Sequence, residues 1–410
     1  MRKRQEIAER HLTEKIREYF PDEDVVLFDI ETTGLSWKTS HVYLIGVLYC
    51  CCGEWILVQW FLDRPSEEKN LLQMFGDFLH DLKGKEKNGN SEEGGGSVRL
   101  LHYNGNLFDL PYIRHKCEFY GLTDPFEGME SVDIYREVRP LQKFLGLPSL
   151  KQKDVEKFLG VEREDRSSGG DLIPVYRRYL ESRDEELLHL LFLHNHDDVA
   201  GMADIIPVLS YPLFFSGGFR LSGEAMVGES GEAMPCGDDF CFQENGASSP
   251  ERQALRIRMK ADHAFPVPAA VTDREYGAVL RLGCGENPLS ADLLIRTRKM
   301  EMKHFFSDYR NYFYLPDEDR AIHRDVAIFV DPEHREKARA ATCYQRARGT
   351  FLPQFSGQIE PAFYMDYKSK PAYFRWEDFQ SRLVGSEETE DETLRQYLLD
   401  FLEVFRRTSR

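Results

Sequence analysis

The stretch that decides the fold is Phe-Asp-Ile-Glu-Thr-Thr-Gly-Leu at positions 28–35, which follows the apolar run Val-Val-Leu at 25–27. An apolar run of this kind predicts a buried central strand. Side chains alternate along a strand with a period of two, so Asp29 and Glu31 share one face at its end. Alone, such a pair can also be two solvated acids at a strand end. The Thr-Thr-Gly-Leu that follows makes the pattern more specific.

The segments that follow predict an α/β fold. Two apolar stretches at 41–51 and 55–61 flank a tight Cys52-Gly53 turn, which indicates an antiparallel meander. Later segments alternate between strand and helix patterns, which predicts a mixed sheet, with a meander and parallel strands, flanked by helices. The expected strands are 98–102 and a short one around Val132, and the expected helices are 71–82, 108–120, 172–180 and 185–209.

The length of 410 residues predicts more than one domain, because single cores stop growing beyond about 250 to 300 residues. We expect an N-terminal helix within 1–20, covering about 4–19, and the α/β domain over 21–210. Residues 211–250, rich in Gly, Ser and acid, are expected to be a linker. An α+β domain of unknown fold and function follows over 251–410.

Composition restricts the class of protein. Hydrophobic residues at 41% and aromatic residues at 12% predict a globular chain. The longest apolar run, 42–52, is shorter than the ~20 residues of a membrane helix, so we expect a cytoplasmic protein without a membrane span. The eight cysteines lack CxxC spacing, which favours reduced thiols. The net charge of -17 is unusual for a nucleic-acid enzyme, but acids gather in an expected linker at 386–393, and bound cations would neutralise a carboxylate cluster.

Two more carboxylates join Asp29 and Glu31 as candidates. Asp109 ends His-Tyr-Asn-Gly-Asn-Leu-Phe-Asp at 102–109, where an Asn-Gly turn precedes a helix; it could also simply cap that helix or interact with its dipole. In the predicted helix 185–209, Asp198 and His194 lie one turn apart on an inward stripe. Asp197 lies on a more polar stripe, so we prefer Asp198, with Asp197 as the alternative.

Converging buried carboxylates repel one another, so they need cations to stay ionised. Two Mg²⁺ or Mn²⁺ ions, ~3.5 to 4 Å apart, could lie between them, which is an arrangement suited to phosphodiester hydrolysis. Oxygen ligands select such hard cations, whereas the sequence lacks the thiolate or paired-histidine spacing of a zinc site.

Taken in order, the carboxylate motifs resemble those of the DEDD exonuclease superfamily, in particular the predicted bacterial ribonuclease-H-like exonucleases of the YprB type. Asp29 and Glu31 match the first motif, Asp109 in Asn-x-x-x-Phe-Asp the second, and Asp198 in Asn-x-x-Asp the third. The resemblance covers about 24–210. It implies a ribonuclease-H-like fold and a 3′-5′ exonuclease acting on nucleic acid with a free 3′ end, single-stranded ends being favoured.

The resemblance also implies roles for individual residues. Asp29 would bridge two metal ions, Glu31 and Asp198 would complete one site, and Asp109 would serve the other. The substrate would be bound by a second group of residues. In it, the backbone of the Thr-Thr-Gly segment would approach the terminal nucleotide and the leucine would wedge against its base; the members are Thr32, Thr33, Gly34, Leu35 and Asn104.

The third motif departs from the two standard forms of the superfamily, which have a tyrosine four residues, or a histidine five residues, before the last aspartate. Here His194 stands four before Asp198. It could be the general base for the attacking water, or a residue at the edge of the core with its hydrogen bond satisfied. Asn195 and His196 are weaker candidates, and Asp133 is expected to be a local cap.

Several alternatives stay open. The chain could be a non-catalytic nucleic-acid-binding or interaction scaffold, or a hydrolase of small nucleotides and oligonucleotides. The choice between DNA and RNA, the pathway, protein partners and oligomeric state are not predicted. A basic cluster could bind phosphates or be an ordinary solvated helix; it comprises Arg335, Lys337, Arg339, Arg346 and Arg348.

Overall fold

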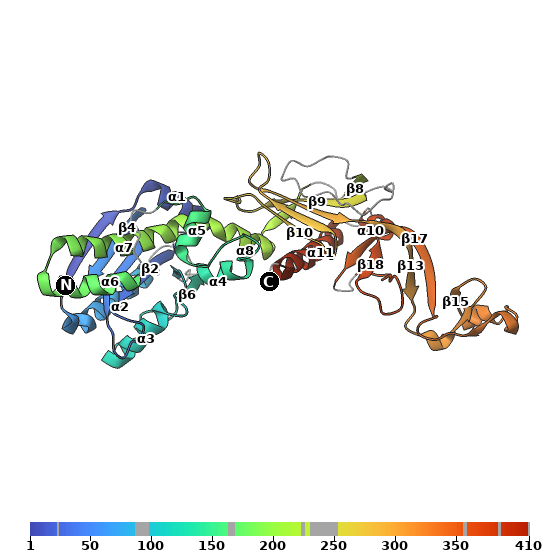
Figure 1. Ribbon diagram of the computed structural model, residues 1–410, viewed down its shortest axis with the longest axis horizontal. Helices are drawn as coiled ribbons and strands as arrows, with labels where there is room; N and C mark the ends of the chain where they lie inside the picture. Colours follow the sequence, from blue (N-terminus) through green and yellow to red (C-terminus); the bar gives the residue numbers. More distant parts are fainter. Residues whose placement is uncertain are drawn as a thin grey trace. The chain divides into compact units, whose positions relative to one another are not determined.

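The computed structural model describes residues 1–22, 24–86, 98–162, 169–222, 226–229, 253–355, 359–383 and 387–408. The chain divides into two compact units. The first is Met1–Leu213 with Ala264–Val267, and the second is Phe214–His263 with Pro268–Arg410. In Figure 1 the first unit runs from blue to green and most of the second from yellow to red.

The first unit contains a 6-stranded sheet in the order β1-β4-β3-β2-β5-β6. The meander of β2, β3 and β4 and the edge strand β1 are antiparallel, whereas β5 and β6 add to β2 in parallel. The predicted mixed sheet is therefore confirmed. Its strands are β1 (Arg2–Ile7), β2 (Val25–Thr32), β3 (Val42–Cys51), β4 (Glu54–Phe61), β5 (Arg99–His102) and β6 (Glu130–Asp133).

Helices cover both faces of this sheet. Phe28 on β2 packs against Phe75 of α2 (Glu68–Glu86), whereas its neighbour Asp29 hydrogen-bonds to α7 (Glu185–Ile205). Because consecutive strand residues face opposite sides, α2 and α7 lie on opposite faces of the sheet. Figure 1 shows α7 crossing the strands of the meander. The other helices of the unit include α1 (Arg10–Tyr19), α3 (Asp109–Tyr120), α4 (Ile134–Val138), α5 (Gln152–Phe158) and α6 (Gly169–Ser182), together with short 3-10 turns η1 (Pro65–Glu67), η2 (Arg139–Leu141) and η3 (Ile206–Leu209).

The residues of the β3–β4 turn explain its geometry. Cys52 and Gly53 have positive φ angles of 55° and 81°, as a two-residue hairpin turn of type I′ requires. The turn sets the antiparallel register that pairs Gly46 with Gln59. This part of the predicted meander is confirmed, as are the predicted helices that became α2, α3, α6 and α7.

The expected N-terminal helix over 4–19 is wrong in its first part. Arg2–Ile7 is a strand that pairs antiparallel with β4, and α1 begins only at Arg10. The charged side chains of this strand are mostly exposed, as is usual at a sheet edge. Backbone pairing with β4 makes Arg2–Ile7 an edge strand of the sheet, and the periodicity of its side chains does not reveal such pairing.

The expected linker over 211–250 is also partly wrong. Its first residues belong to α8 (Ser210–Phe215), and β7 (Phe219–Leu221) and β8 (Met226–Glu229) pair with β9 (Gln253–Ala261). The rest of that range, 223–225 and 230–250, lies outside the described residues. The acidic stretch at 386–393, also expected to be a linker, is helical from its second residue, within α11 (Glu387–Thr408).

The second unit is an α+β arrangement, as predicted. A 6-stranded sheet follows the path β10-β11-β12-β9-β7, with β8 paired to β9, and two 3-stranded sheets have the orders β13-β17-β18 and β15-β14-β16. Its remaining elements are β10 (Ala269–Asp273), β11 (Ala278–Leu282), β12 (Ser290–Arg296), β13 (Arg298–Phe305), η4 (Tyr309–Asn311), β14 (Tyr312–Leu315), β15 (Arg320–His323), α9 (Arg324–Ala327), η5 (Pro332–His334), β16 (Glu336–Lys337), β17 (Tyr344–Gln354), β18 (Ala372–Arg375) and α10 (Trp376–Leu383).

One helical stretch among the described residues, Glu185–Phe215, is long and apolar enough to cross a membrane, with a mean hydropathy of 1.3. Within the structure, 72% of its most apolar window is buried. The core helix of a globular domain meets the same criteria, and α7 packs against β2 and β3 in this way.

Candidate metal centre

Asp29 and Glu31 lie on the central strand β2, on the face that α7 covers. Their main-chain partners on β3 are Gly46 and Leu44, and the register shifts between Glu31 and Thr32. Glu31 is buried and Asp29 is half-buried, at the end of a strand that begins with an apolar run. The period of two thus places the pair where it was expected, at the strand end and under a helix.

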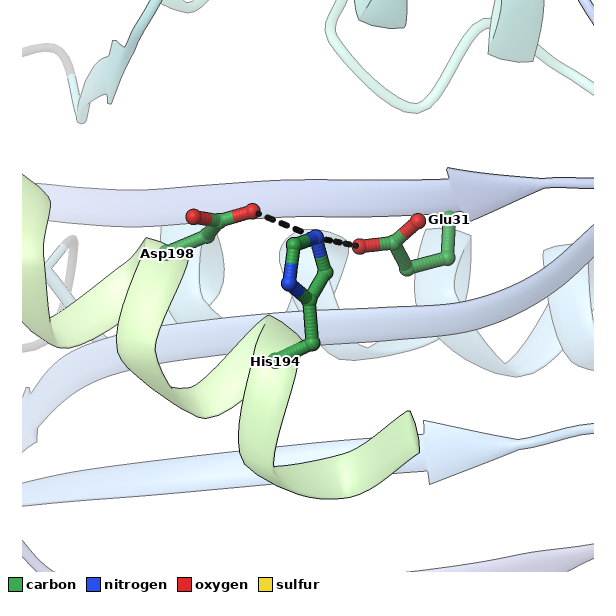
Figure 2. A group of neighbouring side chains, drawn as sticks. All are labelled: Glu31, His194 and Asp198. Carbon is green, nitrogen blue, oxygen red and sulfur yellow. Dashed lines mark ion pairs between the residues drawn. The ribbon is translucent and has the colours of Figure 1, made fainter. Parts of the chain in front are cut away.

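The facing helix α7 adds His194 and Asp198. Figure 2 shows the imidazole between two carboxylates, with Nε2 lying 3.4 Å from Glu31 Oε1 and 3.2 Å from Asp198 Oδ2. The spacing of four residues puts both side chains on one stripe of the helix. One ligand atom from each of the three residues lies within 4.8 Å of the other two, close enough to surround a single metal ion.

Asp29 is at the centre of a group of acids. Burial raises the pKa of its carboxyl well above the usual value, and the charges of Asp198, Glu31 and Asp109 raise it further. A hydrogen bond from Asn195 Nδ2, which lies 3.0 Å from Asp29 Oδ2, lowers this pKa. Carboxylates from three elements therefore lie close enough to repel one another, and added positive charge would favour their ionised forms.

Asp109 is the first residue of α3 and is buried. Burial raises the pKa of its carboxyl to about 7; hydrogen bonds from its own backbone amide and that of Ile30 oppose this, whereas the charges of Asp133 and Asp198 add to it. The amide of Ile30 places Asp109 beside β2. The alternative that Asp109 caps α3 does not hold, because the N-cap is Phe108, without a side-chain cap hydrogen bond.

A buried network shapes the turn that leads to Asp109. Asp133 accepts hydrogen bonds from the backbone amides of Asn104 at 2.8 Å and Asn106 at 3.2 Å. The amide of Gly105 donates to His102 Nδ1 at 3.0 Å, and burial lowers the pKa of His102 to about 4. A Cβ atom on Gly105 would lie 2.6 Å from that nitrogen, so the turn requires glycine. Asp133 also caps α4, as predicted.

Of the expected substrate-binding residues, one is the last residue of β2 and three lie in the loop after it. Thr32, Thr33 and Gly34 are half-buried, and the Thr32 hydroxyl donates to the Gly34 carbonyl at 3.0 Å. A Cβ at Gly34 would lie 2.8 Å from Ser40 Oγ, so the loop is tightly folded. Leu35 follows with 87% of its side chain exposed. Asn104, the fifth, has a positive φ of 61°, and its Oδ1 is buried without a partner among the described residues.

The residues next to Asp198 on α7 differ in what they contact. Asp197 lies 3.4 Å from His196 Nδ1, and His196 Nε2 lies 2.8 Å from Glu6 on β1. Asp198, in contrast, faces His194, and its negative charge raises the pKa of Asp29. The structure thus brings Asp198 into the acidic group.

Three residues near the group were undervalued or missed by sequence reasoning. Asn195, rated a weak candidate, contacts Asp29 directly, and Gln59 on β4 contacts Asn195 at 2.9 Å. The available signal was a lone amide in the apolar strand Trp-Ile-Leu-Val-Gln-Trp-Phe. Tyr43 was also missed; its hydroxyl lies 3.4 Å from Glu31 Oε2.

The basic cluster of the second unit has acidic partners inside the unit. Arg346 pairs with Glu301 and Asp319, and Arg348 pairs with Glu301 at 3.1 Å. The interpretation as a solvated helix is wrong, because Glu336–Lys337 and Tyr344–Gln354 are strands. Phosphate binding by this cluster stays a prediction.

Comparisons with known proteins concern the first unit. The family model described as the RNase_H superfamily matches residues 26–210, a range that contains all four carboxylates. None of the curated proteins matches the chain.

Among solved structures, the zinc-bound form of E. coli exonuclease I with single-stranded DNA is 15% identical over 42% of this chain and 43% of that chain, with a TM-score of 0.25. The E. coli exonuclease I complex with a dT13 oligonucleotide has the same identity, coverage and TM-score. This chain therefore spans less than half the length of these proteins. Residues 26–210 have an RNase H-like fold, whose mixed sheet carries Asp29 and Glu31 on its central strand.

Proposed function

We propose that the chain is a metal-dependent 3′-5′ exonuclease of the DEDD type, with Asp29, Glu31, Asp109 and Asp198 as metal ligands. The observation that carries the proposal is the environment of Asp29, a half-buried residue whose carboxyl pKa is raised by desolvation and by three further carboxylates. A buried acidic group of this kind is costly to ionise, and divalent cations would offset that cost. A non-catalytic scaffold has no need for such a group.

The donor atoms fit Mg²⁺ or Mn²⁺. Carboxylate oxygens are the ligands that hard cations prefer, and one carboxylate oxygen of Glu31 lies within 4.8 Å of one of Asp198. When bound, two such ions would neutralise charge on the phosphate and lower the pKa of the attacking water. Asp29 would be shared between the two ions, with Asp109 serving one of them.

The other residues would position the reactants. His194, between Glu31 and Asp198, would take the proton of the attacking water as general base. The exposed Leu35 would pack against the base of the terminal nucleotide, and the tight loop before it would let the backbone approach the sugar and phosphate. A single-stranded 3′ end would present its last base most easily to such a loop.

The direct test is nucleotide release by the purified chain from 5′-labelled single strands of DNA and RNA with Mg²⁺ or Mn²⁺. We expect a ladder that shortens from the 3′ end, which a 3′-terminal block prevents. Asp29→Asn should abolish it. Equal activity of Asp29→Asn, or activity that persists in a chelator, would contradict the proposal.

A second candidate is hydrolysis of short oligonucleotides. The net charge of -17 and the acidic partners of Arg346 and Arg348 favour a substrate that makes few phosphate contacts. Turnover of substrates from two to thirty nucleotides would distinguish the two. A short-substrate enzyme would show little gain with length and a shallow dependence of KM on salt, because few counterions are released.

A further inference from the structure

Two buried amide side chains connect the backbone of α7 to Asp29. Gln59 on β4 and Asn195 on α7 are both 0% exposed. Gln59 Nε2 lies 2.9 Å from the carbonyl oxygen of Phe192 and 2.9 Å from Asn195 Oδ1. Asn195 Nδ2 then lies 3.0 Å from Asp29 Oδ2. A series of three hydrogen bonds thus connects the Asp29 carboxyl, through Asn195 and Gln59, to the backbone carbonyl of Phe192.

The donor and the acceptor of each of these three hydrogen bonds are fixed. The Phe192 carbonyl can only accept, so it requires the NH₂ group of Gln59. That group also donates to Asn195 Oδ1, which leaves the NH₂ group of Asn195 to face Asp29. Turning either amide over would place oxygen against oxygen.

The arrangement has a cost that a purely apolar contact would avoid. Gln59 Oε1 is buried and has no hydrogen-bond partner within the described part of the chain. A buried acceptor without a partner destabilises the folded state. Gln59 therefore lowers the stability of the folded chain, which is typical of a buried polar residue that belongs to a functional site.

The neighbouring strand is also shaped around Asn195. A Cβ atom on Gly46 of β3 would lie 2.2 Å from Asn195 Oδ1 and 2.9 Å from Val199 Cγ2. Because the first contact is far below van der Waals distance, any side chain at position 46 would displace the amide. Gly46 is the β3 partner of Asp29, so the space for the amide lies beside the carboxyl that it contacts.

We propose that Asn195 is a positioning residue, anchored by Gln59, that holds the Asp29 carboxylate in the orientation that binds divalent cations. The inference rests on the proposed function, because it assigns Asn195 a role through a metal ligand. Hydrogen bonds to ligating groups restrict their rotation, and removing such partners typically costs 10- to 100-fold in metal affinity.

The test is calorimetric titration of Mn²⁺ into the full chain. Asn195→Leu keeps the size of the side chain and removes the donor, and should weaken Mn²⁺ binding about 10- to 100-fold. Gln59→Leu removes only the anchor, so its loss should be smaller, less than about tenfold. The matched control is Gln354→Leu in the second unit, another buried amide that donates to two carbonyls, of Ile359 and Tyr373. It should lower the thermal midpoint and leave Mn²⁺ affinity unchanged.

Gly46→Ala distinguishes a role of Asn195 in orienting Asp29 from a role in packing between β3 and α7. Alone, it should lower both the thermal midpoint and Mn²⁺ affinity, because the new methyl group displaces Asn195. Combined with Asn195→Ala, which removes the clash with the amide and leaves the contact with Val199 Cγ2, it should regain part of the lost thermal midpoint but not the affinity. Recovery of affinity in the double variant would overturn the inference.

Two outcomes distinguish this inference from the proposed function. If the unmodified chain binds Mn²⁺ and Asn195→Leu binds it equally well, the inference fails and the proposed function stands. If the unmodified chain binds no Mn²⁺, the proposed function fails and the inference with it. Should Asn195→Leu not fold, Gln59→Leu decides: an affinity equal to that of the unmodified chain overturns the inference.

Discussion

Carboxylates in the two units of the molecule have opposite environments. In the second unit, Glu301 on β13 pairs with Arg346 and Arg348 across the strand pair, and a hydrogen bond from Arg348 lowers its pKa. In the first unit, burial and the charges of other carboxylates raise the pKa of Asp29, which receives one neutral hydrogen bond, from Asn195.

The difference shows which acids serve the fold and which serve a ligand. Glu301 has its counter-charges within the chain, so its ionised form requires nothing further. For Asp29 and Asp109, burial and the charges of neighbouring acids raise the pKa of the carboxyl, which favours the protonated form more than in an isolated carboxyl. Divalent cations would reverse that preference. Acid content alone, as in the net charge of -17, does not separate these two cases.

The largest expected effect is on catalysis. Asp29→Asn and Asp198→Asn should each lower kcat on the order of 10²- to 10³-fold or more, because each removes charge that would hold a catalytic ion. Glu301→Gln and Asp197→Asn are the matched controls and should change kcat less than about twofold. Steady-state kinetics on a labelled single strand measures this. A large loss in Asp197→Asn with little loss in Asp198→Asn would reverse the choice between the two.

Stability of the metal-free chain should depend on pH through Asp109 and Asp29. Burial raises both pKa values, that of Asp109 to about 7, so the folded state binds more protons than the unfolded state above about pH 4. The free energy of unfolding should therefore fall as pH rises from about 4 to 7, and stay highest below that window.

Urea unfolding at pH 5 and pH 8 measures this dependence. We expect a loss on the order of 1 to 3 kcal/mol at pH 8, which Asp109→Asn reduces and saturating Mn²⁺ offsets. A first unit that becomes more stable between pH 5 and pH 8 without metal would contradict the assigned environment of these carboxyls.

Mn²⁺ affinity should rise with pH over the same range. Ions that bind Asp109 must displace its proton below a pH of about 7, so the apparent affinity should increase up to about tenfold per pH unit and then level off. Titrations in buffers of different ionisation enthalpy count the protons released. No proton release at pH 6 would mean that Asp109 is not a ligand.

The smallest effect is expected in the second unit. Because Glu301 and Asp319 already provide counter-charges for Arg346 and Arg348, Arg346→Gln with Arg348→Gln should change KM for a single strand by less than about twofold. The logarithm of affinity plotted against the logarithm of salt should keep its slope. A slope reduced by about 0.7 for each arginine removed would instead show that they bind phosphates.

Most of the first unit was predictable because its signals are local. The run at 25–27, the turn at Cys52-Gly53 and the helical spacing along α7 each determine an element through its own residues. The edge strand Arg2–Ile7 was not predictable in this way, since its charged, exposed residues mimic an amphipathic helix and only pairing with β4 makes it a strand.

In the candidate site, too, the residues that follow from a local period were predictable, and the contacts between elements were not. Asp29 and Glu31 follow from strand period, and His194 with Asp198 from helical period. The contact of Asn195 with Gln59 depends on α7 crossing β4 at one register, which neither segment encodes alone. In the second unit, the basic residues near Tyr344 were misread because a strand with alternating charges resembles a helix face until its partner β13 is known.

The proposed function requires that Asp29, Glu31, Asp109 and Asp198 share a pair of divalent ions. Crystals of the full chain soaked in Mn²⁺ would reveal such ions by anomalous diffraction. We expect two manganese peaks within the group, ~3.5 to 4 Å apart, with Asp29 contacting both. Manganese bound elsewhere while Asp29 contacts no ion would contradict it.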